Sequence, residues 1–163
     1  NVQTIVGLSP TGTLCFVTSQ AATLIVDVTA YFDSGSSLAP ITPARLLDSR
    51  STGTTIDGQF QGIGLRAAGS TLELDVGGRA GIPGDAGYVI LNVAATSASG
   101  NGFVTAYQCG FVRRPNAATL TFRPSATVNN SVIVPLGVNG TVCLYTSASV
   151  HMIVDAVGYE PST

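Results

Sequence analysis

The sequence predicts an all-β protein, either an antiparallel β-sandwich or a barrel-like fold, with about ten or more short strands. Three observations support this class. Short runs rich in β-branched and aromatic residues alternate with Gly, Pro and Asn turn signals. No stretch keeps a 3.6-residue apolar period over three turns, so helices are not expected. The beginning of the chain is also repeated near its end, which predicts an internally repeated three-stranded meander.

The repeat is gapless. Residues 1–32 align with residues 129–160, always 128 positions apart. Identical pairs include Val6/Val134, Leu8/Leu136, Gly12/Gly140, Cys15/Cys143, Val26/Val154, Asp27/Asp155 and Tyr31/Tyr159. A repeat at a fixed period is typical of arrays and of internally symmetric folds.

Each copy is predicted to form a meander of three strands. A turn signal precedes the central strand in both copies, at residues 9–12 and at Asn139-Gly140. Further strands are expected between the copies, where Gly- and Pro-rich stretches such as 77–84 separate them. The expected strands cover residues 13–17, 24–31, 46–49, 71–76, 88–95, 102–109, 118–122, 141–145 and 152–159.

The domain organisation follows from the repeat and from one small polar stretch. Residues 34–38 are interpreted as a linker. Residues 1–33 are then the C-terminal meander of a preceding unit, and residues 39–160 are a complete unit. We favour this array, in which the chain is a piece of something longer. The alternative is a single domain whose two meanders are related by a pseudo-twofold axis.

Composition excludes several functions. The net charge is −2, so neither nucleic acid nor an anionic membrane is an expected partner. The chain has no Lys, which excludes Lys-based Schiff-base chemistry. No run approaches the ~20 apolar residues that a membrane-spanning helix needs.

The repeat also constrains the three cysteines. Cys15 and Cys143 occupy the same position in the two copies, so Cys109 can pair with only one of them. We predict a Cys109–Cys143 disulfide within one unit, and therefore an oxidising compartment. Cys15 would be unpaired or would pair between molecules. Three reduced thiols are the alternative.

A carboxylate lies inside an apolar strand in both copies, at Asp27 and Asp155. A buried charge needs a partner. Arg45 and Arg50 can each offer a bidentate guanidinium group, and Asp48 lies near them in the sequence. We predict a structural bridge from Asp155 to one of these arginines, with Arg50 slightly preferred over Arg45. An exposed Asp155 is the alternative.

The sequence offers few candidate catalytic, metal-binding or ligand-binding residues. His151 is the only histidine and has no nucleophile motif near it, so no catalytic residue is predicted. The cysteine and carboxylate spacings match no metal-binding motif, and neither a metal nor a cofactor is expected. Tyr88 and Tyr107 are possible platforms for a sugar, with polar groups at Arg113, Arg114 and Asn116. Packing at the edge of the sandwich is the more ordinary role for these tyrosines.

A family resemblance rests on an ordered series of motifs. Pro43-Ala44-Arg45-Leu46-Leu47-Asp48-Ser49-Arg50 opens residues 39–160, and Ile153-Val154-Asp155-Ala156-Val157-Gly158-Tyr159 closes them. The series resembles a tandem-repeat module of secreted actinobacterial proteins, which opens with P-x-R-L-L-D-[ST]-R and closes with I-V-D-V-x-G-Y. The first copy has Ala30 where the closing motif has its glycine.

The resemblance implies an extracellular repeat, strung in tandem or appended to a secreted hydrolase, with no catalytic residues. Together with the repeat, it favours a structural or adhesive module on the cell surface that joins copies of itself or neighbouring units head to tail. The alternative is a carbohydrate-binding module that tethers a secreted hydrolase to cell-wall glycan or polysaccharide.

Overall fold

The computed structural model describes residues 4–26, 28, 31–32, 35–110 and 113–162. These residues contain eight β-strands and no helix, which confirms the all-β class. The strands are β1 (Ala39–Asp48), β2 (Thr71–Asp75), β3 (Tyr88–Thr96), β4 (Gly102–Gln108), β5 (Leu120–Phe122), β6 (Val128–Pro135), β7 (Thr141–Thr146) and β8 (His151–Glu160). All eight lie between residues 39 and 160, and they are fewer than the ten or more that were expected. Apart from β1 and β6, they begin and end close to the expected positions.

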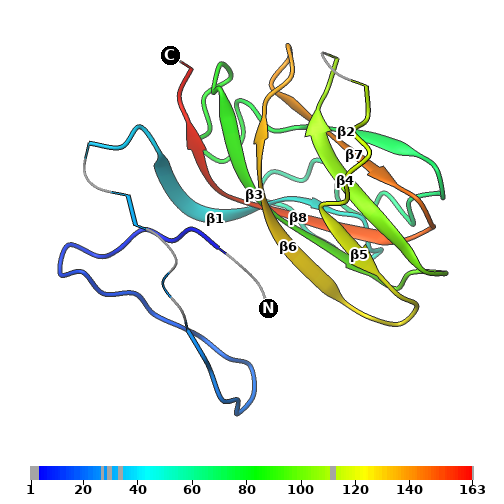
Figure 1. Ribbon diagram of the computed structural model, residues 1–163, viewed down its shortest axis with the longest axis horizontal. Coiled ribbons are helices and arrows are strands. Elements are labelled where there is room, and N and C mark those ends of the chain that lie inside the picture. The colour runs from blue at the N-terminus through cyan, green and yellow to red at the C-terminus, as the bar shows by residue number, and fades with distance from the viewer. Residues whose placement is uncertain (1–3, 27, 29–30, 33–34, 111–112, 163) are drawn as a thin grey trace.

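The strands form two antiparallel sheets of four (Figure 1). The first sheet has the order β1-β8-β3-β6 and the second the order β2-β7-β4-β5. Neither order closes on itself within the described residues, so the arrangement is sandwich-like and not a closed barrel.

The core lies between the sheets. Leu91 and Val154 from the first sheet and Leu74, Val104 and Leu144 from the second belong to one cluster of buried side chains. Each is fully excluded from solvent. Burying an aliphatic side chain of this size stabilises the fold by about 1.5–3 kcal/mol.

Strand β1 forms one edge of the first sheet and pairs only with β8. Pro40 and Pro43 occur in it. Proline has no N–H to donate to a ladder, and an edge strand tolerates this because one of its sides is unpaired. The pairing register shifts between Pro40 and Ala44, which indicates a bulge at the prolines.

The C-terminal copy of the repeat is not a three-stranded meander. Its strands are β6, β7 and β8, but β7 belongs to the second sheet, and β3 separates β6 from β8 in the first. The expectation that consecutive strands pair was therefore wrong. The connections on either side of β7 cross from one sheet to the other, so each strand is bonded to a strand from the preceding part of the chain.

The N-terminal copy contains no strand in its described residues, 4–26, 28 and 31–32, although strands were expected at 13–17 and 24–31. In Figure 1 this segment runs past β1 and projects away from the sheets. Its backbone lacks the neighbouring strands that would pair its N–H and C=O groups in a sheet. A β-branched, aromatic-rich sequence is therefore not sufficient for a strand.

Candidate functional site

The Asp155 carboxylate is paired across the β1–β8 ladder. Arg45 stands opposite Asp155 in the register of the two strands. Its Nε donates to Oδ1 over 2.8 Å and its Nη2 donates to Oδ2 over 3.2 Å. This bidentate hydrogen bonding to Asp155 raises the pKa of Arg45 above its usual value. The bridge thus connects the first strand of the domain to the last.

The prediction that Arg50 is the preferred partner of Asp155 was wrong, because Arg50 pairs with Asp48 instead. Arg50 lies beyond the end of β1 and folds back, donating from Nε to Asp48 Oδ1 over 2.9 Å and from Nη2 to Oδ2 over 2.6 Å. The strand register, which the sequence does not display, places Arg45 and not Arg50 beside Asp155.

Asp48 is the buried carboxylate of this cluster. Its side chain is 1% exposed, whereas that of Asp155 is 24% exposed. The hydrogen bond from Arg50 is the main cause that lowers the pKa of Asp48 below its usual value, and Arg45 approaches the same carboxylate to 3.4 Å. Two arginines and two aspartates thus pair with one another in a single cluster that joins β1, Arg50 beyond its end and β8.

Sequence reasoning missed a buried cation, Arg79. Its guanidinium donates to both Asp57 oxygens, over 2.7 and 2.8 Å, and to the carbonyl oxygens of Asp75 and Leu46. It also lies 5.3 Å from the ring centroid of Phe60. Arg79 therefore joins the loop after β1 to β1 and β2. A lone arginine within the Gly-rich stretch 77–84 was the available signal, but nothing in the sequence selects Asp57 as its partner.

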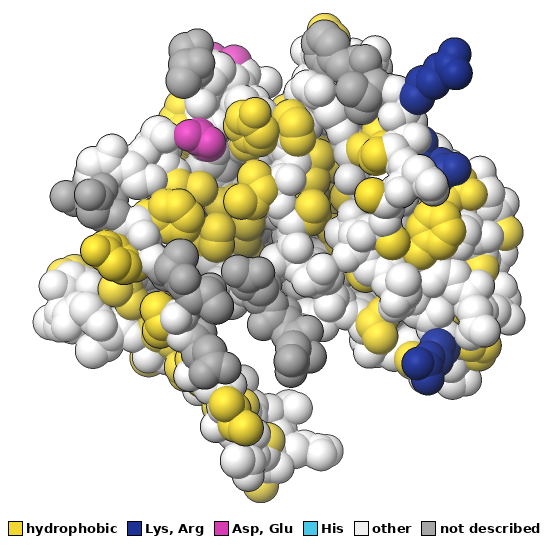
Figure 2. Space-filling view, viewed as in Figure 1, with side chains coloured by type: hydrophobic (Ala, Val, Ile, Leu, Met, Phe, Trp, Pro, Cys, Tyr) yellow, Lys and Arg dark blue, Asp and Glu magenta, His cyan; other side chains and the backbone are white. Residues whose placement is uncertain are grey.

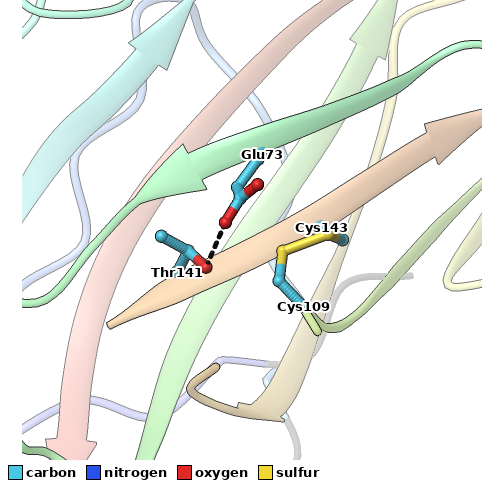
Figure 3. Close-up of a disulfide and its surroundings, with 4 residues drawn as sticks. All are labelled: Glu73, Cys109, Thr141 and Cys143. Atoms are coloured by element: carbon cyan, nitrogen blue, oxygen red, sulfur yellow. Dashed lines mark hydrogen bonds between the residues drawn. A yellow bond between two sulfur atoms is a disulfide. The ribbon is translucent and has the colours of Figure 1, made fainter. Parts of the chain in front are cut away.

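The predicted disulfide is present. Cys109, directly after β4, is bonded to Cys143 of the neighbouring strand β7, with their Cα atoms 5.1 Å apart (Figure 3). Beside it the Thr141 hydroxyl donates to Glu73 of β2 over 2.9 Å. Cys15, which the repeat aligns with Cys143, is free and exposed. The two equivalent cysteines thus differ in bonding although their sequence context is alike.

The two candidate sugar platforms do not form one surface. Tyr88 begins β3 in the first sheet, and Tyr107 lies in β4 of the second. Arg114, named as a nearby polar group, stacks on Tyr145 at 4.1 Å from the ring centroid. Of two shallow surface hollows, one is lined by residues of β4, β5 and the loop before β6, and the other by residues of β4, β6 and the loop before β5. Neither includes Tyr88 or Tyr107.

A serine–histidine contact lies between the residue after β1 and the start of β8. The Ser49 hydroxyl lies 3.0 Å from His151 Nδ1 and accepts the Met152 N–H over 2.9 Å. Ser49 is completely buried, so no substrate can reach its oxygen. This contact ties the end of β1 to the start of β8.

Among the described residues, no group of three or more His, Cys, Asp or Glu side chains could hold a metal ion. That part of the chain also has no helix of the length and apolar character that crossing a membrane requires.

The N-terminal segment is the remaining candidate site, because it exposes large apolar side chains. Among them are Leu8, Phe16, Val17, Ile25 and Val28. Figure 2 shows apolar side chains along the projecting segment. An exposed apolar area of this kind is typical of a surface that contacts another protein.

No protein-family model matches this chain, and no curated protein is detectably similar to it. The class of the protein therefore rests on its structure. It is an all-β domain of two antiparallel sheets, closed by one disulfide, with a sequence copy of its last three strands lying outside the sheets.

Proposed function

We propose that this chain is a non-catalytic, extracellular structural or adhesive repeat module that joins copies of itself or neighbouring units head to tail into a fibre. One observation carries the proposal. The two sheets are built from β1 to β8, and the chain also holds a sequence copy of the last three of these strands whose apolar side chains are exposed. A segment of this composition gains stability when another unit covers it.

The charged groups of the domain support a structural role. The Arg45–Asp155 and Arg50–Asp48 pairs satisfy one another, and Arg79 is occupied by Asp57 and two carbonyl oxygens. The only described serine–histidine contact is closed to solvent at Ser49. These groups are arranged to stabilise a fold.

The extracellular location is supported by the Cys109–Cys143 disulfide, because disulfides persist mainly in oxidising compartments. The ordered motifs between Pro43 and Tyr159 also support membership of the secreted actinobacterial tandem repeats that they resemble. The carbohydrate-binding alternative has less support, because Tyr88 and Tyr107 lie in different sheets.

Light scattering tests the proposal. The molar mass of the full chain should grow with concentration from the micromolar range upward, in the presence of reductant as well as in its absence. A full-length variant with Phe16→Ser, Val17→Ser and Val26→Ser should remain monomeric. The matched control is Ile133→Ser with Val138→Ser, which changes exposed apolar residues of the domain itself and should associate like the wild type. A wild-type chain that stays monomeric throughout contradicts the proposal.

A further inference from the structure

The N-terminal copy has the side-chain pattern of a strand set that lacks its partner. Val26 is 56% exposed, whereas its equivalent Val154 in β8 is fully buried. Phe16 is 57% exposed, and its equivalent Leu144 in β7 is fully buried. The same contrast holds for Val6 and Val134, Leu8 and Leu136, Leu14 and Val142, Leu24 and Met152, and Val28 and Ala156.

The copy also keeps one piece of the local structure of its counterpart, the turn before the central strand. Gly12 has a φ of 75° and the equivalent Gly140 a φ of 70°. In the first copy Ser9 N–H donates to Thr13 O over 2.9 Å, and the equivalent bond from Gly137 N–H to Thr141 O measures 2.8 Å. The bonds from Gly12 N–H and Gly140 N–H to the carbonyl three residues earlier both measure 2.9 Å. The turn is thus present in the first copy although the described residues on either side of it belong to no sheet.

We infer that residues 4–32 are a strand donor, which completes the β1–β5 part of another unit of this fold in the places that β6, β7 and β8 hold here. This inference rests on the proposed function and adds to it the partner and the mode of binding. In those places β8 is bonded on both sides, by β1 and β3, and β7 by β2 and β4. β6 pairs with β3 alone. A donor therefore gains five ladders of backbone hydrogen bonds in addition to the burial of its apolar face.

The polar groups of the donor fit the same acceptor. Cys15 would occupy the place of Cys143, beside an acceptor cysteine equivalent to Cys109. Asp27 lies outside the described residues, but the repeat aligns it with Asp155, which pairs with Arg45. The expected partner thus carries a cysteine and an arginine at these two positions.

Side-chain volume explains why strands β1–β5 of this chain, its own acceptor, hold the C-terminal copy and not the N-terminal one. The donor has Phe16 for Leu144 and Val28 for Ala156, and both of these replaced side chains are fully buried. It also has Ala30 for Gly158, where a Cβ atom would lie 3.0 Å from Ile90 Cδ1 and 3.1 Å from Ala39 O. Extra volume in a packed core is destabilising. The preferred acceptor therefore has more room at these places, for instance a residue smaller than Ile90.

Binding of the donor can also be tested on strands β1–β5 of the same chain, because residues 33–38 are long enough to connect a donor in the place of β8 to the start of β1. Tyr159 at the end of β8 stands opposite Ala39 at the start of β1, and the Ser37 hydroxyl donates to Glu160 over 2.7 Å. A donor ending at Phe32, the equivalent of Glu160, would connect to Ala39 through residues 33–38 as in an antiparallel hairpin.

Disulfide mapping tests the inference in the wild-type chain. The chain is held in a glutathione redox buffer with urea below the unfolding midpoint, so that the Cys15 thiolate can attack the Cys109–Cys143 disulfide. Attack on the Cys109 sulfur forms Cys15–Cys109 and releases Cys143 as the thiolate, so no net oxidant is consumed. Strand donation predicts a large excess of Cys15–Cys109 over Cys15–Cys143, because Cys15 and Cys143 compete for one place. Random collision predicts comparable amounts, since loop-closure probability changes slowly with loop length.

The Cys143→Ser variant gives a second, larger signal, because it removes the disulfide of the resident copy. Oxidised glutathione takes two electrons and two protons from Cys15 and Cys109 and is reduced to two thiols. We expect most of the protein to acquire Cys15–Cys109. The matched control is Cys143→Ser with Cys15→Ser and Val17→Cys, which moves the thiol two residues along to a position that is 94% exposed. It should react far less with Cys109.

Equal reaction of the two thiols, or no Cys15–Cys109 in either experiment, overturns the inference. The mass of the non-reduced species tells whether donation occurs within one chain or between two, and both results place the segment on β1–β5. Association without Cys15–Cys109 leaves the structural module standing and removes the strand donor. Cys15–Cys109 within a monomer supports strand donation to the chain's own β1–β5 and contradicts both head-to-tail joining and donation to another unit.

Discussion

The two copies of the repeat share a pattern but not a conformation. Residues 128–160 supply β6, β7 and β8, whereas the described part of residues 4–32 forms no strand. The turn at Gly12 and Gly140 is the same in both. The difference teaches that the turn is encoded locally, while the strands depend on the ladders that β1–β4 provide.

The largest expected effect comes from placing a charge at equivalent valines. Val154→Glu should prevent folding, because an unpaired carboxylate in the core costs several kcal/mol of the typical 5–15 kcal/mol of domain stability. Val26→Glu should leave the melting temperature of the domain unchanged. Thermal melts followed by circular dichroism measure both. Equal loss in the two variants would mean that residues 4–32 are part of the folded domain.

Removal of a disulfide-bonded cysteine and of the free cysteine sharpens the comparison further. Cys109→Ser opens a disulfide across 34 positions and should lower the free energy of unfolding by about 3–4 kcal/mol. Cys15→Ser should change it by less than about 0.5 kcal/mol, as expected for an exposed side chain. Urea titrations without reductant give both values. A large loss in Cys15→Ser would show that this thiol is already engaged.

Acid should weaken the domain through Asp57. Bonding to Arg79 lowers the pKa of Asp57 from 3.8 to about 2, so the native state holds this carboxylate ionised more strongly than the unfolded chain does. Its contribution is fully present above about pH 4 and is lost as the pH falls toward 2. The measurement is the urea midpoint of wild type and Asp57→Asn at pH 5, 3 and 2. The difference between them should shrink with acid, and a constant difference would contradict the assignment.

Much of the fold could be predicted from local signals. The all-β class, the strands from β2 onward except β6, and the Cys109–Cys143 pair follow from composition, turn residues and the repeat. The order of strands in the sheets could not be predicted, because a meander and a crossing between sheets present the same alternation of side chains to sequence analysis.

The ion pairs show the same limit at the level of single residues. The sequence indicates that Asp155 needs an arginine, but only the register of β1 on β8 selects Arg45. Arg79 was missed because its partners, Asp57 and the carbonyls of Leu46 and Asp75, meet only after the loop has folded back.

The adjacency of Ala39 and Tyr159 has a mechanical consequence. The first and last strands are antiparallel neighbours whose outer ends lie together, so a force on the two ends of the domain would open the β1–β8 ladder one pair at a time, as a zipper opens. The first firm resistance along that path would be the Arg45–Asp155 bridge. The Cys109–Cys143 bond would then keep the chain between those residues, with β5 and β6, from extending. A domain built in this way would extend under modest tension, and its disulfide would limit the length to which the chain can be extended.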